Sequence, residues 1–201
     1  MLVLNSRLLG APVLSVQTGG PIGRISNIIV NPDNLKIIAF RVDGPPVNKQ
    51  QNILDVRSVR EYSNYGFVID DIDELVSPDD VIKISEVLKL NFNLIDLKVE
   101  TKKGSKLGKV QGFTVTSEDF IIQQIIVKRP MIKSLNDPEL TISRNEIVEI
   151  TDYKIIIKDE EKTLKKKAEK EEFIPNFVNP FRESQPGFAP ADTKTPDAQD
   201  N

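Results

Sequence analysis

The chain has no cysteine, no histidine and no tryptophan among its 201 residues. Without cysteine it can form no disulfide, no thiolate nucleophile and no cysteine-ligated zinc or iron–sulfur centre. Without histidine it lacks the commonest general base and metal ligand near neutral pH. Carboxylate, lysine, tyrosine and serine chemistry stay open, but no motif of an activated nucleophile accompanies these residues. We therefore expect a binding protein and not an enzyme, with no catalytic residue, no cofactor and no metal.

Long apolar runs are also missing. The chain starts with four apolar residues, Met1-Leu-Val-Leu, and then becomes polar. A signal peptide needs a basic stretch ahead of about 7–15 apolar residues, and neither is present. No segment approaches the ~18 consecutive apolar residues of a membrane-spanning helix. We therefore expect a cytoplasmic protein with no integral membrane segment.

Neither sign of charge dominates, because 27 Lys and Arg residues stand against 30 Asp and Glu residues, for a formal net charge of −3. A protein that depends on phosphate contacts usually has a strongly basic domain, so RNA binding is only an alternative here. We interpret the main group of lysines first as the solubilising charges of an exposed hairpin. The candidate RNA contact comprises Lys98, Lys102, Lys103, Lys106 and Lys109, joined by Lys128, Arg129 and Lys133.

What the chain does contain is an internal repeat. Ile22-Gly23-Arg24-Ile25 recurs 85 residues later as Leu107-Gly108-Lys109-Val110, and the apolar positions that follow recur at the same offset. Further on, Asp55-Val56-Arg57-Ser58-Val59 matches Glu146-Ile147-Val148-Glu149-Ile150, which places about six extra residues in the second copy. Two copies of one small module therefore make up residues 1–158.

Each copy has the pattern of β-strands, with short runs rich in valine and isoleucine separated by glycine, proline and asparagine. Within the first long run, Ile25 belongs to one face, whereas Ile28 and Val30 belong to the other. The second copy repeats this slip after Val110. A change of face inside a strand is what a β-bulge produces, and bulged, bent strands close small sheets into barrels. We therefore predict a mainly β protein with two small β-barrels in tandem.

A helix is predicted between the two copies. Ser77-Pro78-Asp79-Asp80 offers an N-cap serine, a proline at the first helical position and acidic residues in the first turn. Apolar residues then follow at helical spacing, which indicates a helix over residues 77–90 that packs against a barrel end or lies between the two barrels. The apolar positions are Val81, Ile84, Val87 and Leu88.

The repeated pattern resembles the PRC-barrel family. The residues that carry the resemblance are Leu9-Gly10-Ala11-Pro12-Val13, Ile22-Gly23-Arg24-Ile25 and Asp55-Val56, with Leu107-Gly108-Lys109-Val110 and Glu146-Ile147 in the second copy. The family includes the cytoplasmic domain of the photosynthetic reaction-centre H subunit and the carboxy-terminal domain of a ribosome maturation factor. The resemblance implies a non-catalytic protein–protein or assembly module. We expect neither named function to transfer directly, because the segments that precede those two barrels have no counterpart here.

Two stretches imitate ligand sites. Gly104 and Gly108 precede a lysine, but a phosphate-binding loop needs four residues between its glycines and a hydroxyl after the lysine, whereas three residues and Val110 stand here. The acidic residues between Asp70 and Asp80 are interrupted by apolar ones, unlike a calcium loop. We interpret the first stretch as a hairpin turn and the second as a solvated linker with a helix cap.

The composition changes after Lys158. Residues 159–172 are mostly lysine and glutamate with i,i+4 pairs, which predicts a charged helix or spacer. Residues 173–201 are rich in proline and phenylalanine and have no strand pattern, so we expect them to be disordered. They contain an apolar motif that either binds a partner or folds back onto the chain's own barrels. The motif comprises Phe173, Ile174, Phe177, Val178 and Phe181.

These segments predict a first barrel at 1–76, a connecting helix at 77–90, a second barrel at 91–158, a charged segment at 159–172 and a disordered tail at 173–201. We expect a cytoplasmic, non-enzymatic adaptor or assembly module that binds a protein partner. The alternative is an RNA- or ribosome-associated maturation factor that uses the basic hairpin region of the second barrel.

Overall fold

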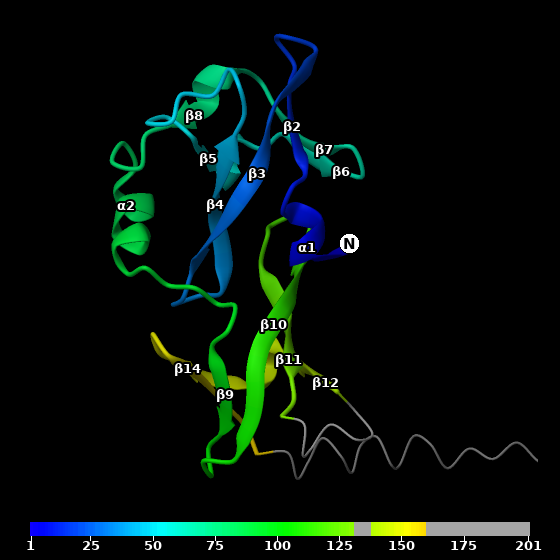
Figure 1. The fold of residues 1–201 in the computed structure, drawn as a ribbon, viewed down its shortest axis with the longest axis vertical. Helices are drawn as coiled ribbons and strands as arrows, with labels where there is room; N and C mark the ends of the chain where they lie inside the picture. The colour runs from blue at the N-terminus through cyan, green and yellow to red at the C-terminus, as the bar shows by residue number, and fades with distance from the viewer. Residues whose placement is uncertain (131–137, 160–201) are drawn as a thin grey trace, which may run out of the picture. The chain divides into compact units, whose positions relative to one another are not determined.

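In the computed structural model, residues 1–130 and 138–159 are described, and they fold mainly into β-strands. The strands form two seven-stranded sheets, both within the unit Met1–Glu161. Figure 1 shows the long hairpin of each sheet, β3 with β4 and β10 with β11. None of the helices in the described residues is long and apolar enough to cross a membrane.

The first sheet comes from the first copy of the repeat and has the strand order β6-β7-β2-β3-β4-β5-β8. Its neighbours are antiparallel except β2 and β7, which are parallel. The strands are β2 (Pro12–Ser15), β3 (Gly20–Asn31), β4 (Lys36–Asp43), β5 (Ile53–Asp55), β6 (Glu61–Ser63), β7 (Gly66–Ile69) and β8 (Leu75–Val76), with short 3₁₀ turns η1 (Val56–Ser58) and η2 (Ile72–Glu74).

The second sheet repeats this order as β13-β14-β9-β10-β11-β12, again with one parallel pair, β9 with β14. The amino-terminal strand β1 pairs with β10 as its seventh member. The strands are β1 (Leu2–Leu4), β9 (Lys98–Thr101), β10 (Lys106–Thr116), β11 (Ile122–Lys128), β12 (Glu139–Ser143), β13 (Ile147–Ile150) and β14 (Lys154–Ile157), with the 3₁₀ turn η4 (Arg144–Glu146).

The mainly β fold is confirmed, but two closed tandem barrels are not. The structure contains a curled half-barrel sheet. Within the described residues, the two end strands of the first sheet, β6 and β8, do not pair with each other, and neither do the end strands β12 and β13 of the second sheet.

The β-bulges predicted from the slip in alternation are present in both copies. In each long hairpin the pairing register shifts twice, and equivalent shifts are 85 residues apart. An extra residue on one strand bends that strand and increases its twist, so both hairpins carry a source of curvature at equivalent places. The shifts lie between Ile25 and Asn27 and between Ile29 and Val30 in β3, and between Val110 and Gly112 and between Thr114 and Val115 in β10.

The predicted match of Asp55 with Glu146 is wrong by three residues. Asp55 lies opposite Ala39 on β4, and Ser143 lies opposite Gln124 on β11. Ala39 and Gln124 are equivalent, because β4 and β11 match at the 85-residue offset. Asp55 therefore corresponds to Ser143, at an offset of 88, and the second copy has three extra residues rather than six. The error arose because both copies place an acidic residue before an apolar one. In the structure Glu146 caps its own turn, with its Oε2 accepting from Ser143 N at 3.0 Å.

The connecting helix α2 is shorter than predicted and runs over Ile82–Lys89. Ser77 is not its N-cap, because Ser77 N donates to Asp80 Oδ2 at 2.9 Å and Asp80 N donates to Ser77 O at 3.1 Å. These bonds close a separate turn, and the helix starts after Val81 without a side-chain cap. The predicted packing role is confirmed. Ile84 is 2% exposed and shares a small apolar cluster with Ile29, Ala39 and Ile53.

The first strand and the first helix of the chain attach to the second sheet. β1 runs antiparallel to the end of β10, and the short helix α1 (Asn5–Leu8) follows it on the same strand. Phe113 N donates to Asn5 Oδ1 at 3.1 Å across 108 residues of sequence. The two copies are therefore tied together by the chain's own amino terminus.

The turns of the two long hairpins contact each other, and one residue of each turn accepts a backbone hydrogen bond from the other hairpin. Ile37 N donates to Phe120 O at 3.0 Å, and Ile122 N donates to Leu35 O at 2.9 Å. These bonds are equivalent at the 85-residue offset, so the contact has the reciprocal form of a two-fold dimer interface. Leu35 and Phe120 both have positive φ, 47° and 54°, and both are buried. The ring of Phe120 joins Phe40, Phe67 and Tyr62, which makes one core of both copies.

Candidate functional site

Four lysines occupy one row across the second sheet. Lys109 on β10 lies opposite Lys128 on β11 and opposite Lys98 on β9, and Lys98 lies opposite Lys154 on β14. Residues directly opposite each other share a face of the sheet, and neighbouring strands are about 4.8 Å apart. The first three lysines are exposed and Lys154 is half-buried. We call these four residues the lysine row.

The lysine row is electrostatically unfavourable within the chain, because like charges directly opposite each other destabilise a sheet. Glu100 offsets one charge, since its Oε2 lies 3.4 Å from Lys154 Nζ. The side chains of Lys98, Lys109 and Lys128 make no hydrogen bond or ion pair with the described residues. Three neighbouring cations are therefore unpaired and exposed within the part of the chain that the structure describes.

The structure divides the predicted basic hairpin region. Lys98 and Lys109 lie together in the row, whereas Lys102, Lys103 and Lys106 lie at the turn end of the β9–β10 hairpin. Lys103 Nζ is 4.0 Å from Asp159 Oδ2. Lys128, predicted as an extension of the region, joins the row, and Lys133 lies outside the described residues. Sequence reasoning missed Lys154, which the parallel pairing of β14 with β9 brings beside Lys98.

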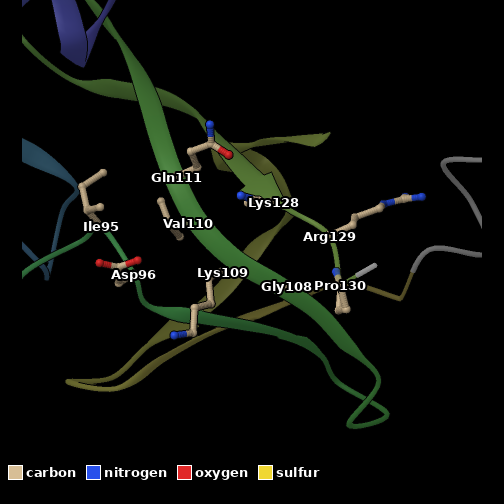
Figure 2. A pocket seen from close by; sticks show the side chains of 9 residues that line it. All are labelled: Ile95, Asp96, Gly108, Lys109, Val110, Gln111, Lys128, Arg129 and Pro130. Carbon is tan, nitrogen blue, oxygen red and sulfur yellow. The ribbon is translucent and has the colours of Figure 1, made fainter. Parts of the chain in front are cut away.

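A pocket lies beside the row, with a volume of about 510 Å³. Figure 2 shows its side chains around β10 and around the segment that follows β11. Asp96 is fixed at its rim because Asp96 N donates to Val110 O at 2.9 Å. The lining combines apolar side chains with polar and cationic ones. The apolar residues are Ile95, Val110 and Pro130, and the others include Asp96, Lys109, Gln111, Lys128 and Arg129.

The first sheet has a different feature, a groove of about 630 Å³ between α2 and the β3–β4 hairpin. A second cavity of about 450 Å³ shares Asp33, Asn34 and Leu90 with it and reaches β13. Leu90 is 52% exposed and Val148, in the second cavity, is 43% exposed. We call these two cavities together the α2 groove. Its apolar lining includes Ile38, Val56, Val81, Val87 and Leu90, and its charged lining includes Lys36, Arg57, Lys83 and Glu86.

Asp55 and Arg57 form an ion pair at the edge of the α2 groove. Asp55 Oδ2 accepts from Arg57 Nη2 at 2.6 Å, and its Oδ1 accepts from Arg57 Nε and from the Arg57 backbone N–H. Burial raises the pKa of Asp55, but the hydrogen bonds and charge of Arg57 outweigh burial and leave that pKa below its usual value. The carboxylate is therefore ionised at neutral pH and holds the turn η1 in place.

Three of the acidic residues between Asp70 and Asp80 serve local structure. Asp70 Oδ1 accepts from Arg60 Nη1 at 2.5 Å, and Asp71 caps η2 through Ile72 N. Asp80 closes the turn before α2. No group of three or more acidic residues in the described residues could hold a metal ion.

The apolar tail motif of Phe173, Ile174, Phe177, Val178 and Phe181 lies outside the described residues, as does the charged segment after Asp159. No family model matches the chain, and comparison with curated proteins found no relative. The resemblance to the PRC-barrel family and the tail contact therefore stay predictions.

Proposed function

We propose that the protein is a non-enzymatic adaptor or assembly module built from two PRC-type barrels, each opened into a curled sheet. The order of six strands that the two copies share, the parallel pair in each and the duplicated bulges support a tandem of one domain type. The lack of histidine and cysteine supports a binding role over catalysis.

The observation that carries this proposal is that one shared core holds two different surfaces. The reciprocal contacts of Leu35 and Phe120 join the copies, yet the first copy has the α2 groove and the second has the lysine row. A repeat that served only stability would need neither surface. Two distinct surfaces on one body are what an adaptor needs in order to hold two partners at once.

The partner of the α2 groove is an apolar segment of another protein. The groove is lined by apolar side chains from α2 and β4 and by charges of both signs, Lys36 and Lys83 against Glu86. Such a groove buries alternate apolar side chains of a bound peptide and orients it through the charged rim. Leu90 and Val148 are apolar and exposed along its length, where a partner would cover them.

The test is affinity capture of proteins from the native host after RNase treatment. The groove variant carries Leu90→Lys with Val148→Lys. The matched control carries Val16→Lys with Tyr65→Lys, two exposed apolar residues in turns of the first copy. We expect the groove variant to lose proteins that the control retains. Identical capture by both would remove the groove as a contact.

A chain that ends at Glu172 separates the groove from the tail motif. If the proteins lost by the groove variant remain bound to the shortened chain, the groove is their contact. If they are lost on truncation and retained by the groove variant, the tail motif is the contact and the groove proposal is wrong. If truncation increases their binding, the tail motif itself competes for the groove.

A further inference from the structure

The two copies provide an internal comparison for the lysine row. Their equivalent positions follow from the strand registers, which pair Pro12 with Arg24 and Arg24 with Asp43 in the first sheet. In the second sheet the same positions hold Lys98, Lys109 and Lys128. The first copy therefore carries one positive and one negative charge where the second copy carries three positive charges.

The difference extends around the row. In the first copy, Gly44 stands at the position equivalent to Arg129 of the second copy, and Gly66 stands at the position equivalent to Lys154. In the first copy Arg24 Nη1 donates to Gly10 O at 2.9 Å, so its charge is held against the chain's own backbone. The first copy therefore folds without the lysines of the row, and in the second copy the positive charges of these lysines repel one another. A destabilising row that the fold does not require indicates an anionic ligand.

The pocket beside the row narrows the class of ligand. Its volume of about 510 Å³ is within the range of small-ligand sites. Ile95 and Pro130 give it apolar walls, and Asp96 and Gln111 add hydrogen-bonding groups. A planar base fits such a lining, and Lys109 and Lys128 at its edge fit an attached phosphate.

We propose that the lysine row and this pocket bind single-stranded nucleic acid, with consecutive phosphates along the row and one base in the pocket. The row crosses four neighbouring strands with three spacings of about 4.8 Å between them, so it spans roughly 14 Å. Its lysines lie in a line, as the phosphates of a nucleic-acid backbone do. An acidic helix would pair with the lysines but would leave the apolar pocket empty. This inference rests on the adaptor function proposed above, because it names the ligand of the second surface, and it assigns a site to the RNA alternative.

The test measures the fluorescence anisotropy of a labelled uridine strand of about twelve nucleotides with the full chain. The row variant carries Lys98→Gln, Lys109→Gln and Lys128→Gln. The matched control carries Arg7→Gln, Lys49→Gln and Lys89→Gln, at three exposed cations outside both the row and the α2 groove. Each variant removes three positive charges, which changes the formal net charge from −3 to −6. Thermal unfolding checks that both variants stay folded.

The expected effect follows from counterion release. Three phosphate contacts to a single strand, at about 0.7 each, give a salt slope near −2. Raising salt fourfold, from about 50 to 200 mM, should therefore weaken binding roughly 20-fold. In the row variant, affinity at low salt should fall at least ~10-fold and the slope should approach zero, whereas the control should change less than ~2-fold.

Other results overturn the proposal. If the control variant weakens binding of the strand as much as the row variant does, the strand is attracted by net charge alone. If the unchanged protein does not bind the strand at low salt, the lysine row is not a nucleic-acid site. If polyglutamate displaces the strand at equal charge concentration, the partner class is an acidic protein. If equal-part phosphatidylcholine–phosphatidylserine vesicles bind the row while RNA does not, the partner is a membrane surface. If a strand with abasic sites binds equally well, no base enters the pocket. None of these results affects the groove proposal, which rests on different residues.

Discussion

Replacing Phe120 with alanine should destabilise both sheets, although Phe120 belongs to the second copy. Its ring is 3% exposed and lies 5.5 Å from the ring of Phe40, 6.0 Å from that of Phe67 and 6.1 Å from that of Tyr62. All three partners belong to the first sheet. Phe120→Ala therefore removes a side chain that fills the core of the other copy and leaves a cavity among aromatic rings.

The expected magnitude follows from this burial. Truncation of a buried phenylalanine costs about 3–5 kcal/mol. The positive φ of Phe120 does not reduce this cost, because alanine and phenylalanine share the same restriction there. For a domain of this size each kcal/mol lowers the midpoint of thermal unfolding by about 2–4 °C, so we expect a decrease of roughly 6–20 °C.

Circular dichroism gives the midpoint, and amide hydrogen exchange shows where protection is lost. We expect a single transition and faster exchange in β4 and β7 as well as in β10 and β11. Tyr65→Ala is the control, since Tyr65 is 82% exposed and its loss should cost less than ~0.5 kcal/mol. A loss below ~1 kcal/mol, or faster exchange confined to the second sheet, would refute the shared core.

Three further predictions concern single positions. Gly23→Ala should cost about 1–3 kcal/mol in urea unfolding, because its Cβ would lie 2.7 Å from a backbone carbonyl oxygen of β4, whereas Gly20→Ala, with open space around its Cβ, should cost under ~0.5 kcal/mol. Arg144→Ala should cost about 1.5–3 kcal/mol, since its guanidinium donates to three backbone carbonyls at 2.6–3.3 Å, and Arg144→Lys should recover only part of this loss. Asp55 has a lowered pKa in the folded state, so its stabilisation is present above its unfolded pKa near ~3.9 and is lost as pH falls through the folded value. The stability difference between the protein and Asp55→Asn, measured by urea midpoints, should therefore be constant above pH ~5 and shrink below pH ~4; a constant difference down to pH ~3 would contradict this reasoning.

The strand pattern and the bulges could be predicted because they depend on local alternation. The face change after Ile25 recurs after Val110, and two independent copies of one irregularity are much stronger than one. The end of the repeat was misaligned because Asp55-Val56 and Glu146-Ile147 look alike, whereas Ser143, the true equivalent of Asp55, has no acidic side chain. Similarity of short apolar motifs does not determine which residue caps a turn.

The start of α2 shows a competition between local signals. Ser77-Pro78-Asp79-Asp80 has the composition of a helix start, but the same residues close a turn of their own through Ser77 and Asp80. Asparagine, aspartate and serine favour turns and caps for the same reason, since their side chains bind nearby backbone N–H groups. Composition alone therefore could not separate the two outcomes.

The contacts that join the copies could not be predicted from the sequence. β1 of the first copy pairs with β10 of the second. Leu35 and Phe120 each contact the other copy's hairpin, and both have a positive φ that non-glycine residues rarely adopt. The lysine row was predicted only in part for a related reason. Lys98 and Lys109 are neighbours in one hairpin, but Lys154 reaches the row through a parallel pairing 56 residues away.

The central claim is that one body presents two independent binding surfaces. The most direct test is to compare, in one capture experiment without RNase, the row variant, the groove variant and their two matched controls. The account predicts that the row variant loses nucleic acid and the proteins bound to it, that the groove variant loses a different set of proteins, and that both controls retain everything. If the two variants lose the same partners, or if neither loses any that its control retains, the claim is wrong.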